Sequence, residues 1–302
     1  MPPVRVRGLE PADGEALTAL VERARDAGEL LGSSAPHGEW VVPLALAQPS
    51  QVAVAEVAGS LAGVVLPEVK ALVVEPGFRR RGIGRALVGA GLAIERERGR
   101  PELLLGILPG DAPGRAFLAA TGFSYHSTVW DLELVASAPV PAAVWPDGFT
   151  ARAFDRSRDL EPWVALFNVA FAEHATPLTI DEATWRATWD DPTVADDDVL
   201  VVVGPAGGLV GFCATDSPHV GDGSAPRRGE IWTIGVAPEH RGRGLGRQLL
   251  RWGVARLRGL GVATVRLAVS ARNPAALALY ESDGFGRTTT RDRWARPVEP
   301  RA

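Results

Sequence analysis

Residues Glu230 to Leu250, EIWTIGVAPEHRGRGLGRQLL, combine the three parts of a site for anions. The apolar run Ile231 to Val236 predicts a buried strand, and Pro238 ends it because proline has no N–H to donate to a sheet. In the loop that follows, three arginines alternate with three glycines, and leucines at helical spacing then predict a helix. Glycines allow backbone N–H groups to converge, and a helix N-terminus carries partial positive charge. The stretch is therefore typical of a phosphate-binding loop; the alternative interpretation is a structural turn whose arginines face water.

The same pattern occurs earlier in the chain, where residues 69–88 read VKALVVEPGFRRRGIGRALV. Arg79 corresponds to Arg241, and Gly84 to Gly246, at one constant offset (241 − 79 = 162). The register continues without a gap to the Gly-Phe pairs at 122–123 and 284–285. It indicates a duplicated domain rather than two chance loops.

Both loops resemble the signature of the GNAT superfamily of acyl-CoA-dependent N-acyltransferases, which is Arg/Gln-x-x-Gly-x-Gly/Ala after the fourth strand. The signature reads RGRGLG at 241–246 and RRRGIG at 79–84. The resemblance covers nearly the whole chain as two tandem domains. It implies an α/β (α+β) fold in which each domain is a mixed, mostly antiparallel sheet flanked by helices, with splayed central strands.

Length and composition agree with two folded domains. A chain of 302 residues with 46% hydrophobic and 23% charged residues is long enough for two cores and is not disordered. The net charge of −4 argues against a nucleic-acid partner, and the single cysteine, Cys213, excludes an intramolecular disulfide. Neither a signal-peptide pattern nor an apolar stretch of membrane-spanning length is visible, so we expect a cytoplasmic protein without a membrane partner.

Strand and helix patterns follow one order twice. In the first half we expect strands at 4–7, 51–57, 61–66, 69–74, 103–108 and 123–134, and helices from about 11, at 82–98 and at 113–120. In the second half we expect strands at 149–154, 199–203, 209–215, 231–236, 264–269 and 285–294, and helices at 159–171, 180–189, after the glycine loop to 257 and at 273–282. The Pro- and Ala-rich stretch 135–147 predicts a linker between domains at 1–134 and 148–302.

The resemblance implies two sites for coenzyme A. Strand backbone would hold the pantetheine arm, and loop amides would grip the pyrophosphate. In the second half these residues are Ile234, Gly235, Val236, Arg241, Gly242, Arg243, Gly244, Leu245, Gly246, Arg247 and Asn273. In the first half they are Leu72, Val73, Val74, Arg79, Arg80, Arg81, Gly82, Ile83, Gly84 and Arg85. The alternative for Ile234 and Val236 is a purely core role, which also fits their side chains.

Acyl transfer to an amine needs a base for the amine proton and an acid for the departing thiolate. Glu230, at the start of the central strand beside apolar neighbours, is the candidate base, because a carboxylate in a partly apolar cleft has a raised pKa. Tyr280 is the candidate acid, because it lies in the segment NPAALALYESDGF at 273–285, which resembles the superfamily element Asn-x-x-Ala-x-x-x-Tyr-x-x-x-Gly-Phe. The alternatives are an exposed strand-end carboxylate for Glu230 and a core aromatic residue for Tyr280.

The first half departs from the pattern where chemistry is expected. Leu118 stands in the place of Tyr280 and Asp111 in the place of Asn273, although Glu68 does match Glu230. Leucine cannot donate a proton, so we expect the second domain to be catalytic and the first to be non-catalytic but able to bind CoA.

Other side chains give weaker signals. His174 and Trp232 are candidate acceptor contacts; the alternatives are a surface histidine and a core aromatic residue. Cys213 fits a small core residue, and no His/Cys/Asp spacing indicates a metal site.

The expected activity is therefore transfer of an acetyl group from acetyl-CoA to the primary amine of a small molecule. The whole tandem pattern resembles the mycothiol synthase type of acetyltransferase, which implies a cysteinyl amine as one possible acceptor. The other alternative is a CoA-binding regulatory pseudoenzyme. We expect a small-molecule partner, and a monomer or weak dimer.

Overall fold

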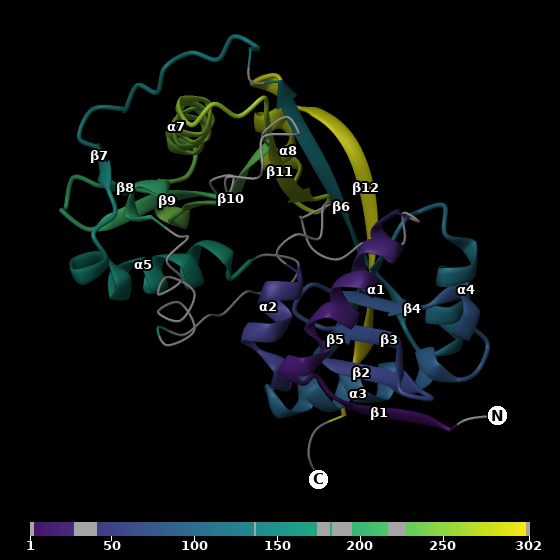
Figure 1. Ribbon diagram of the computed structural model, residues 1–302. Helices are drawn as coiled ribbons and strands as arrows, with labels where there is room; N and C mark the ends of the chain where they lie inside the picture. The colour runs from purple at the N-terminus through teal and green to yellow at the C-terminus, as the bar shows by residue number, and fades with distance from the viewer. Residues whose placement is uncertain are drawn as a thin grey trace. The chain divides into compact units, whose positions relative to one another are not determined.

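The computed structural model describes residues 3–26, 41–135, 137–173, 182, 195–216 and 228–299. The chain forms two compact units (Figure 1). The first contains residues 1–129 together with 290–302, and the second contains residues 130–289.

The first unit contains an antiparallel sheet in the order β1-β2-β3-β4. These strands are Val4–Gly8, Ala53–Val57, Ser60–Leu66 and Ala71–Val74. Side chains alternate between the two faces: Val64 packs with helices α1 (Gly14–Asp26) and α2 (Val41–Ala47), while Val65 packs with α3 (Ile83–Glu97). Three short 3-10 turns lie at Pro11–Asp13, Pro49–Gln51 and Pro76–Phe78.

The first unit is completed by β5 (Glu102–Ile107), α4 (Ala112–Ala120) and parts of two long strands. β6 is Ser124–Val135 and β12 is Gly286–Pro297. β5 pairs antiparallel with Asp292–Pro297 of β12, so the first unit takes a strand from the end of the chain.

In the second unit the strand order is β7-β8-β9-β10-β11, and β6 lies next to β11. The first five are Thr150–Ala153, Val199–Val203, Leu209–Asp216, Arg228–Val236 and Thr264–Ser270. Figure 1 shows α7 (Leu245–Gly259) on one face and α5 (Arg156–Phe171) on the other. α8 (Pro274–Ser282) follows β11, and 3-10 turns lie at Asp196–Asp198 and Pro238–His240.

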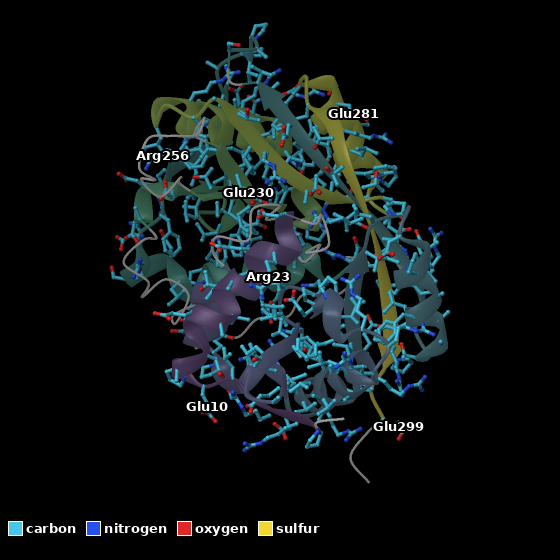
Figure 2. All side chains as sticks on the ribbon, turned by 45° about the vertical axis from the view of Figure 1, so that its right-hand side comes forward. Glu10, Arg23, Glu230, Arg256, Glu281 and Glu299 are labelled. Atoms are coloured by element: carbon cyan, nitrogen blue, oxygen red, sulfur yellow. The ribbon has the colours of Figure 1, made fainter. Side chains whose placement is uncertain are left out.

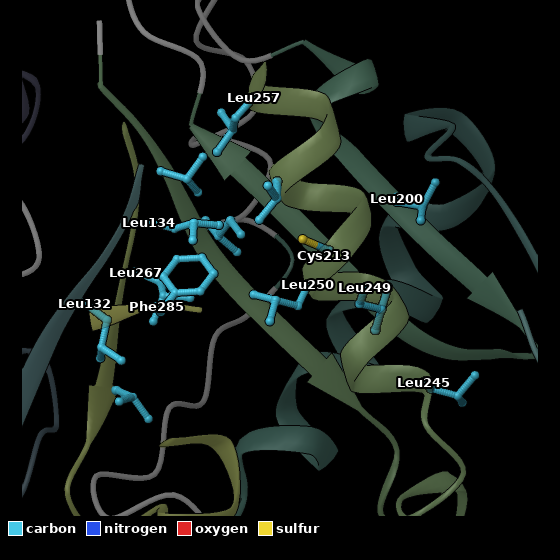
Figure 3. Close-up of a cluster of buried hydrophobic side chains, with 14 of the residues drawn as sticks. Leu132, Leu134, Leu200, Cys213, Leu245, Leu249, Leu250, Leu257, Leu267 and Phe285 are labelled. Atoms are coloured by element: carbon cyan, nitrogen blue, oxygen red, sulfur yellow. The ribbon is translucent and has the colours of Figure 1, made fainter. Parts of the chain in front are cut away.

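Two apolar clusters cover the two faces of this second sheet. On the α7 side, Leu249, Leu250 and Leu257 meet strand residues that include Leu134 and Cys213 (Figure 3). Cys213 is fully buried, which confirms its predicted core role, and burial raises the pKa of its thiol. On the α5 side, the fully buried Trp163 packs against Phe212 at 5.1 Å between ring centroids. Both faces thus fix β9 and β10, which carry the candidate site.

The predicted splay of the central strands is present. β10 pairs parallel with β11 only at Arg228, Gly229 and Glu230, whereas its antiparallel pairing with β9 continues to Val236. The sheet is therefore mixed and mostly antiparallel, and β10 and β11 no longer pair beyond Glu230.

Several elements differ from the expected ranges: helix α2 is not among the expected helices, and β10 and α5 begin at Arg228 and Arg156 rather than at 231 and 159. β4 begins at Ala71 rather than at 69, because residues 67–70 form a turn in which Lys70 has φ of 58°. Residues 130–135 and 290–299 belong to compact units that contain mainly the other half of the sequence. The limits 1–134 and 148–302 remain a proposal for the two sequence repeats. No helix among the described residues is long and apolar enough to cross a membrane.

Candidate active site

The glycine loop of the second unit presents the uncapped start of a helix. Gly242 and Gly244 have φ of 76° and 83°, and Gly244 is the N-cap of α7 without a side-chain hydrogen bond. Only glycine adopts such angles at little cost, and the first N–H groups of a helix have no partner within it. The turn therefore directs backbone donors and the positive end of α7 to one place, as the sequence predicts.

The loop arginines have separate roles in the geometry. The exposed guanidinium of Arg241 donates hydrogen bonds to the carbonyls of Val236 (3.3 Å) and Ala170 (3.0 Å). It also forms an ion pair with Glu173. Arg247 donates to Ser282 Oγ at 2.9 Å. Arg243 is exposed, and among the described residues it forms no ion pair. Arg241 thus ties the loop to the end of β10 and to α5.

Strand β10 leads into this loop with Ile234 and Val236 packed against the α7 cluster. A Cβ atom on Gly235 would lie 2.3 Å from the Phe212 ring, so this position requires glycine for packing. The side chains of Ile234 and Val236 are partly buried against this cluster, and their expected role in holding pantetheine concerns the backbone alone.

Tyr280 lies on α8 beside the start of α7. Asn273 caps α8 by accepting a hydrogen bond from the Ala276 N–H at 3.0 Å, which confirms its predicted capping position. Leu279 lies 3.6 Å from where a Cβ on Gly246 would be. The ring of Tyr280 packs against Phe285 and the α7 cluster. Burial, with a smaller contribution from the nearby Cys213, raises the pKa of Tyr280 well above its usual value, so the hydroxyl stays protonated at neutral pH.

Glu230 lies where β10 and β11 last pair, opposite Arg266 of β11 and Asp216 of β9, and its side chain is half-buried (Figure 2). A β-bulge follows between Ile231 and Thr233, so that Trp232 is the extra residue. Trp232 is 46% exposed, unusual for so large an apolar side chain. The bulge thus lies within β10, between Glu230 and the part of the strand that leads to the loop.

The corresponding site of the first unit is built differently. Its loop keeps the backbone shape, with Gly82 at φ of 83° and Arg80 at φ of 63°. However, the ring of Phe117 lies 2.9 Å from where a Cβ on Gly84 would be, and Leu118, in the place of Tyr280, is fully buried.

The first unit also lacks a strand carboxylate equivalent to Glu230. Glu68 lies in the turn before β4, where Arg98 (2.5 Å) and Arg100 (3.2 Å) contact its carboxylate. Burial alone would raise the pKa of Glu68, but Arg100, Lys70 and Arg98 lower it overall. A carboxylate held ionised by cations is a poor base near neutral pH.

Two expected features fall on residues that are not described. His174 and all of the predicted helix at 180–189 except residue 182 lie outside the described residues. Within the described residues no group of three His, Cys, Asp or Glu side chains could hold a metal ion.

One residue that the sequence patterns did not single out is Asp283. Its carboxylate is 5% exposed and contacts both Arg247 (3.4 Å) and Arg251 (3.2 Å) of α7. The repeat register does distinguish this residue. The first half has Thr121 and Gly89 where the second half has Asp283 and Arg251, so this acidic and basic pair occurs in the second half alone.

A glycine loop at a helix start in each unit, together with the splayed strands of the second unit, defines a tandem acyltransferase. The chain belongs to the acetyltransferase (GNAT) family, whose profile matches residues 18–123 and 160–285.

Among curated proteins, the chain is similar to the mycothiol acetyltransferase of Thermobispora bispora. The two are 36% identical over 299 residues, which cover 95% of this chain and 97% of the relative. The mycothiol acetyltransferase of Salinispora arenicola is 39% identical over 227 residues, covering 74% of this chain and 72% of the relative.

Two solved structures share the fold over nearly the whole chain. A GCN5-related N-acetyltransferase from Sphaerobacter thermophilus superposes with a TM-score of 0.71 at 21% identity, covering 100% of this chain and 98% of the other. A tandem GNAT protein from the clavulanic acid biosynthesis pathway has a TM-score of 0.68 at 22% identity, covering 99% of this chain and 100% of the other. The tandem architecture predicted from the 162-residue register is therefore confirmed.

Proposed function

We propose that this acyltransferase moves an acetyl group from acetyl-CoA to the primary amine of a small molecule, and that the reaction takes place in the second unit. The observation that supports this most is the uncapped start of α7, which lies beside the helix that carries Tyr280. Peptide N–H groups and the helix dipole suit the diphosphate of coenzyme A. Arg243 adds a full positive charge at the mouth of the loop.

The proposed chemistry is direct attack. Glu230 accepts a proton from the ammonium form of the acceptor, directly or through water, so that the nitrogen gains a lone pair. The nitrogen attacks the thioester carbonyl, the C–N bond forms and the C–S bond breaks. Tyr280 donates its hydroxyl proton to the departing sulfur, and the second proton that the nitrogen loses as it becomes an amide returns to the Tyr280 oxygen, directly or through water. An unperturbed phenol, with a pKa of about 10, already holds its proton at neutral pH and is able to give it to a departing thiolate.

We propose that the first unit does not catalyse transfer. Leu118 has no proton to donate, and the carboxylate of Glu68 is held ionised by its ion pairs with Arg98 and Arg100. Its loop retains the backbone shape of a CoA site, with Arg79 bonded to the Val74 carbonyl at 3.0 Å as Arg241 is to Val236. Binding of CoA at 79–85 without turnover is the role that this geometry supports.

A cysteinyl amine is the acceptor that we would test first. The similarity to mycothiol acetyltransferases extends over 95% of the chain and includes both repeats. The exposed Trp232 beside Glu230 offers a flat apolar surface for such an acceptor. No nucleic-acid or membrane partner is part of the proposal, which assumes a monomer or weak dimer.

Labelled acetyl-CoA, offered with a panel of amines, tests the proposal. The panel should contain a cysteinyl glucosamine conjugate, free cysteine, glucosamine and an aminoglycoside. Transfer of label to one amine, lost in the Glu230→Gln variant, would support the account. Tight CoA binding without transfer to any amine would favour the regulatory pseudoenzyme.

A further inference from the structure

Asp283 connects the CoA loop to the helix of the candidate acid. It is the C-cap residue of α8, and its backbone N–H donates to the carbonyls of Leu279 and Tyr280, both at 3.2 Å. The N–H of Phe285 donates to the same Tyr280 carbonyl at 3.0 Å. The C-terminal end of α8 is thus fixed by two hydrogen bonds to the backbone carbonyl of Tyr280.

The carboxylate of Asp283 links this end of α8 to α7. It contacts Arg247, the last arginine of the glycine loop, and Arg251 one turn further along. Arg247 also donates to Ser282 Oγ at 2.9 Å, which itself donates to the Leu279 carbonyl at 2.8 Å. Two helices are therefore joined by ionic and hydrogen-bonded contacts at the point where donor binding and proton transfer must be aligned.

The link is specific to the second unit. At the same register the first half has Thr121 for Asp283, Gly89 for Arg251 and Ala120 for Ser282, while Arg85 matches Arg247. Thr121 instead bonds its own helix, at 2.8 Å to the Phe117 carbonyl. The half that keeps the loop but lacks the tyrosine therefore lacks the link as well.

We propose that Asp283 is a positioning residue, which holds Tyr280 in place relative to the loop through Arg247 and Arg251. The inference rests on the proposed function, since it assigns Asp283 a role only if Tyr280 donates the proton. The carboxylate is buried, and removing one partner of a buried ion pair leaves the other charges uncompensated. Small displacements of a reacting group lower rates strongly, because alignment supplies much of the catalytic effect.

A double-mutant cycle distinguishes positioning from general stabilisation. In the wild-type background, Asp283→Asn should lower kcat by about tenfold to a hundredfold. In the Tyr280→Phe background the same change should lower kcat by less than about twofold, because there is no proton donor left to align. CoA affinity, measured by calorimetry, should change by less than about threefold in either background.

Two variants guard against trivial loss of folding. Arg251→Met removes one partner of Asp283 and leaves the other, Arg247, in place. It should therefore lower kcat by less than Asp283→Asn does, and only in the protein that keeps Tyr280. Glu281 lies on the same helix as Tyr280 and forms an exposed ion pair with Arg287 of β12. Glu281→Gln breaks this pair and should leave kcat unchanged. Thermal unfolding of each variant shows that the compared proteins are folded.

Equal losses of kcat in the tyrosine and phenylalanine backgrounds, with Asp283→Asn or with Arg251→Met, would overturn the positioning role. That outcome would leave the proposed function intact, provided that the wild type transfers acetyl groups and Tyr280→Phe is impaired. No transfer by the wild type would instead remove the proposed function itself.

Discussion

Tyr280 shows how one side chain depends on its surroundings. The element at 273–285 predicted its place on a short helix, and the structure adds that α8 packs beside the start of α7. Its hydroxyl is protonated at neutral pH because even an unperturbed phenol has a pKa of about 10, and burial raises the pKa of Tyr280 further. The equivalent Leu118 fills space in the core of the first unit and offers no such group.

Replacing Tyr280 by phenylalanine should lower kcat by about 10²- to 10⁴-fold, the usual contribution of a general acid. The affinity for CoA should remain within a factor of about three, because the missing hydroxyl acts on the leaving sulfur rather than on binding. Steady-state kinetics and calorimetry measure the two effects. The matched control is Tyr125→Phe, which alters the only other tyrosine, 56% exposed in the first unit. Full activity of the Tyr280 variant would disprove the acid assignment.

Arg241 is exposed, yet it connects the loop to the end of β10 and to α5. Arg241→Ala should weaken CoA binding by about three- to tenfold, because the loop loses hydrogen bonds to Val236 and Ala170. Arg79→Ala, 162 positions earlier, should leave turnover at saturating acetyl-CoA unchanged. CoA titration and initial rates report both. A collapse of turnover in the Arg79 variant would show that the first unit takes part in catalysis.

At the scale of elements, the start of α7 depends on two glycines with different constraints. Gly244 has φ of 83°, whereas a Cβ on Gly246 would meet only Leu279, at an ordinary 3.6 Å. The repeated sequence of the loop could predict that both were needed. It could not show that Gly244 is required by its backbone angle, whereas the surroundings of Gly246 have room for a Cβ atom.

Gly244→Ala should therefore destabilise the second unit by about 1 kcal/mol or more and weaken CoA binding, because alanine is strained in the left-handed conformation. Gly246→Ala should be close to neutral in both measurements. Urea unfolding and CoA titration of the two variants check this contrast. Equal behaviour of the two would contradict the assigned backbone geometry.

The start of α5 contains a carboxylate whose ionisation stabilises the fold. Burial by itself raises the pKa of Asp159, but hydrogen bonds from Arg152, Arg158 and the Asp155 N–H bring the pKa down to about 2. The folded state therefore binds this proton less readily than the unfolded state, whose pKa is about 3.8. The resulting stability is fully present above pH about 4 and is lost as the pH falls toward about 2.

Asp159→Asn should accordingly lower the free energy of unfolding by about 1–2 kcal/mol at pH 7 and by less at pH 2.5. Urea unfolding at the two pH values measures the difference. Glu161→Gln, exposed on the same helix, is the control and should show no such pH dependence. A cost for Asp159→Asn that is the same at both pH values would contradict the role of its charge.

At the scale of the whole molecule, the constant register predicted two repeats of one fold, and the family match and tandem structures agree. Local periodicity predicted the strands and the helix after each glycine loop, and the family resemblance implied the mixed sheet. It could not predict that β5 pairs with Asp292–Pro297, because strand partners nearly 190 residues apart leave no local signal in the residues themselves.

Deletion of residues 290–302 should therefore destabilise the first unit, although these residues belong to the second half of the sequence. β5 would lose the strand residues with which it pairs, and Trp294 would no longer pack in the cluster around α3. Hydrogen exchange of residues 102–107 measures the effect, and full protection of β5 in the truncated chain would contradict the pairing. Trp294→Ala is a milder variant that should increase exchange in the same strand.

A crystal structure with bound acetyl-CoA tests the central claim most directly. The account predicts the diphosphate on the backbone N–H groups of residues 242–247, and the sulfur within hydrogen-bonding distance of the Tyr280 hydroxyl. A second unit without nucleotide at saturating donor, or a Tyr280 hydroxyl directed away from the sulfur, would contradict it.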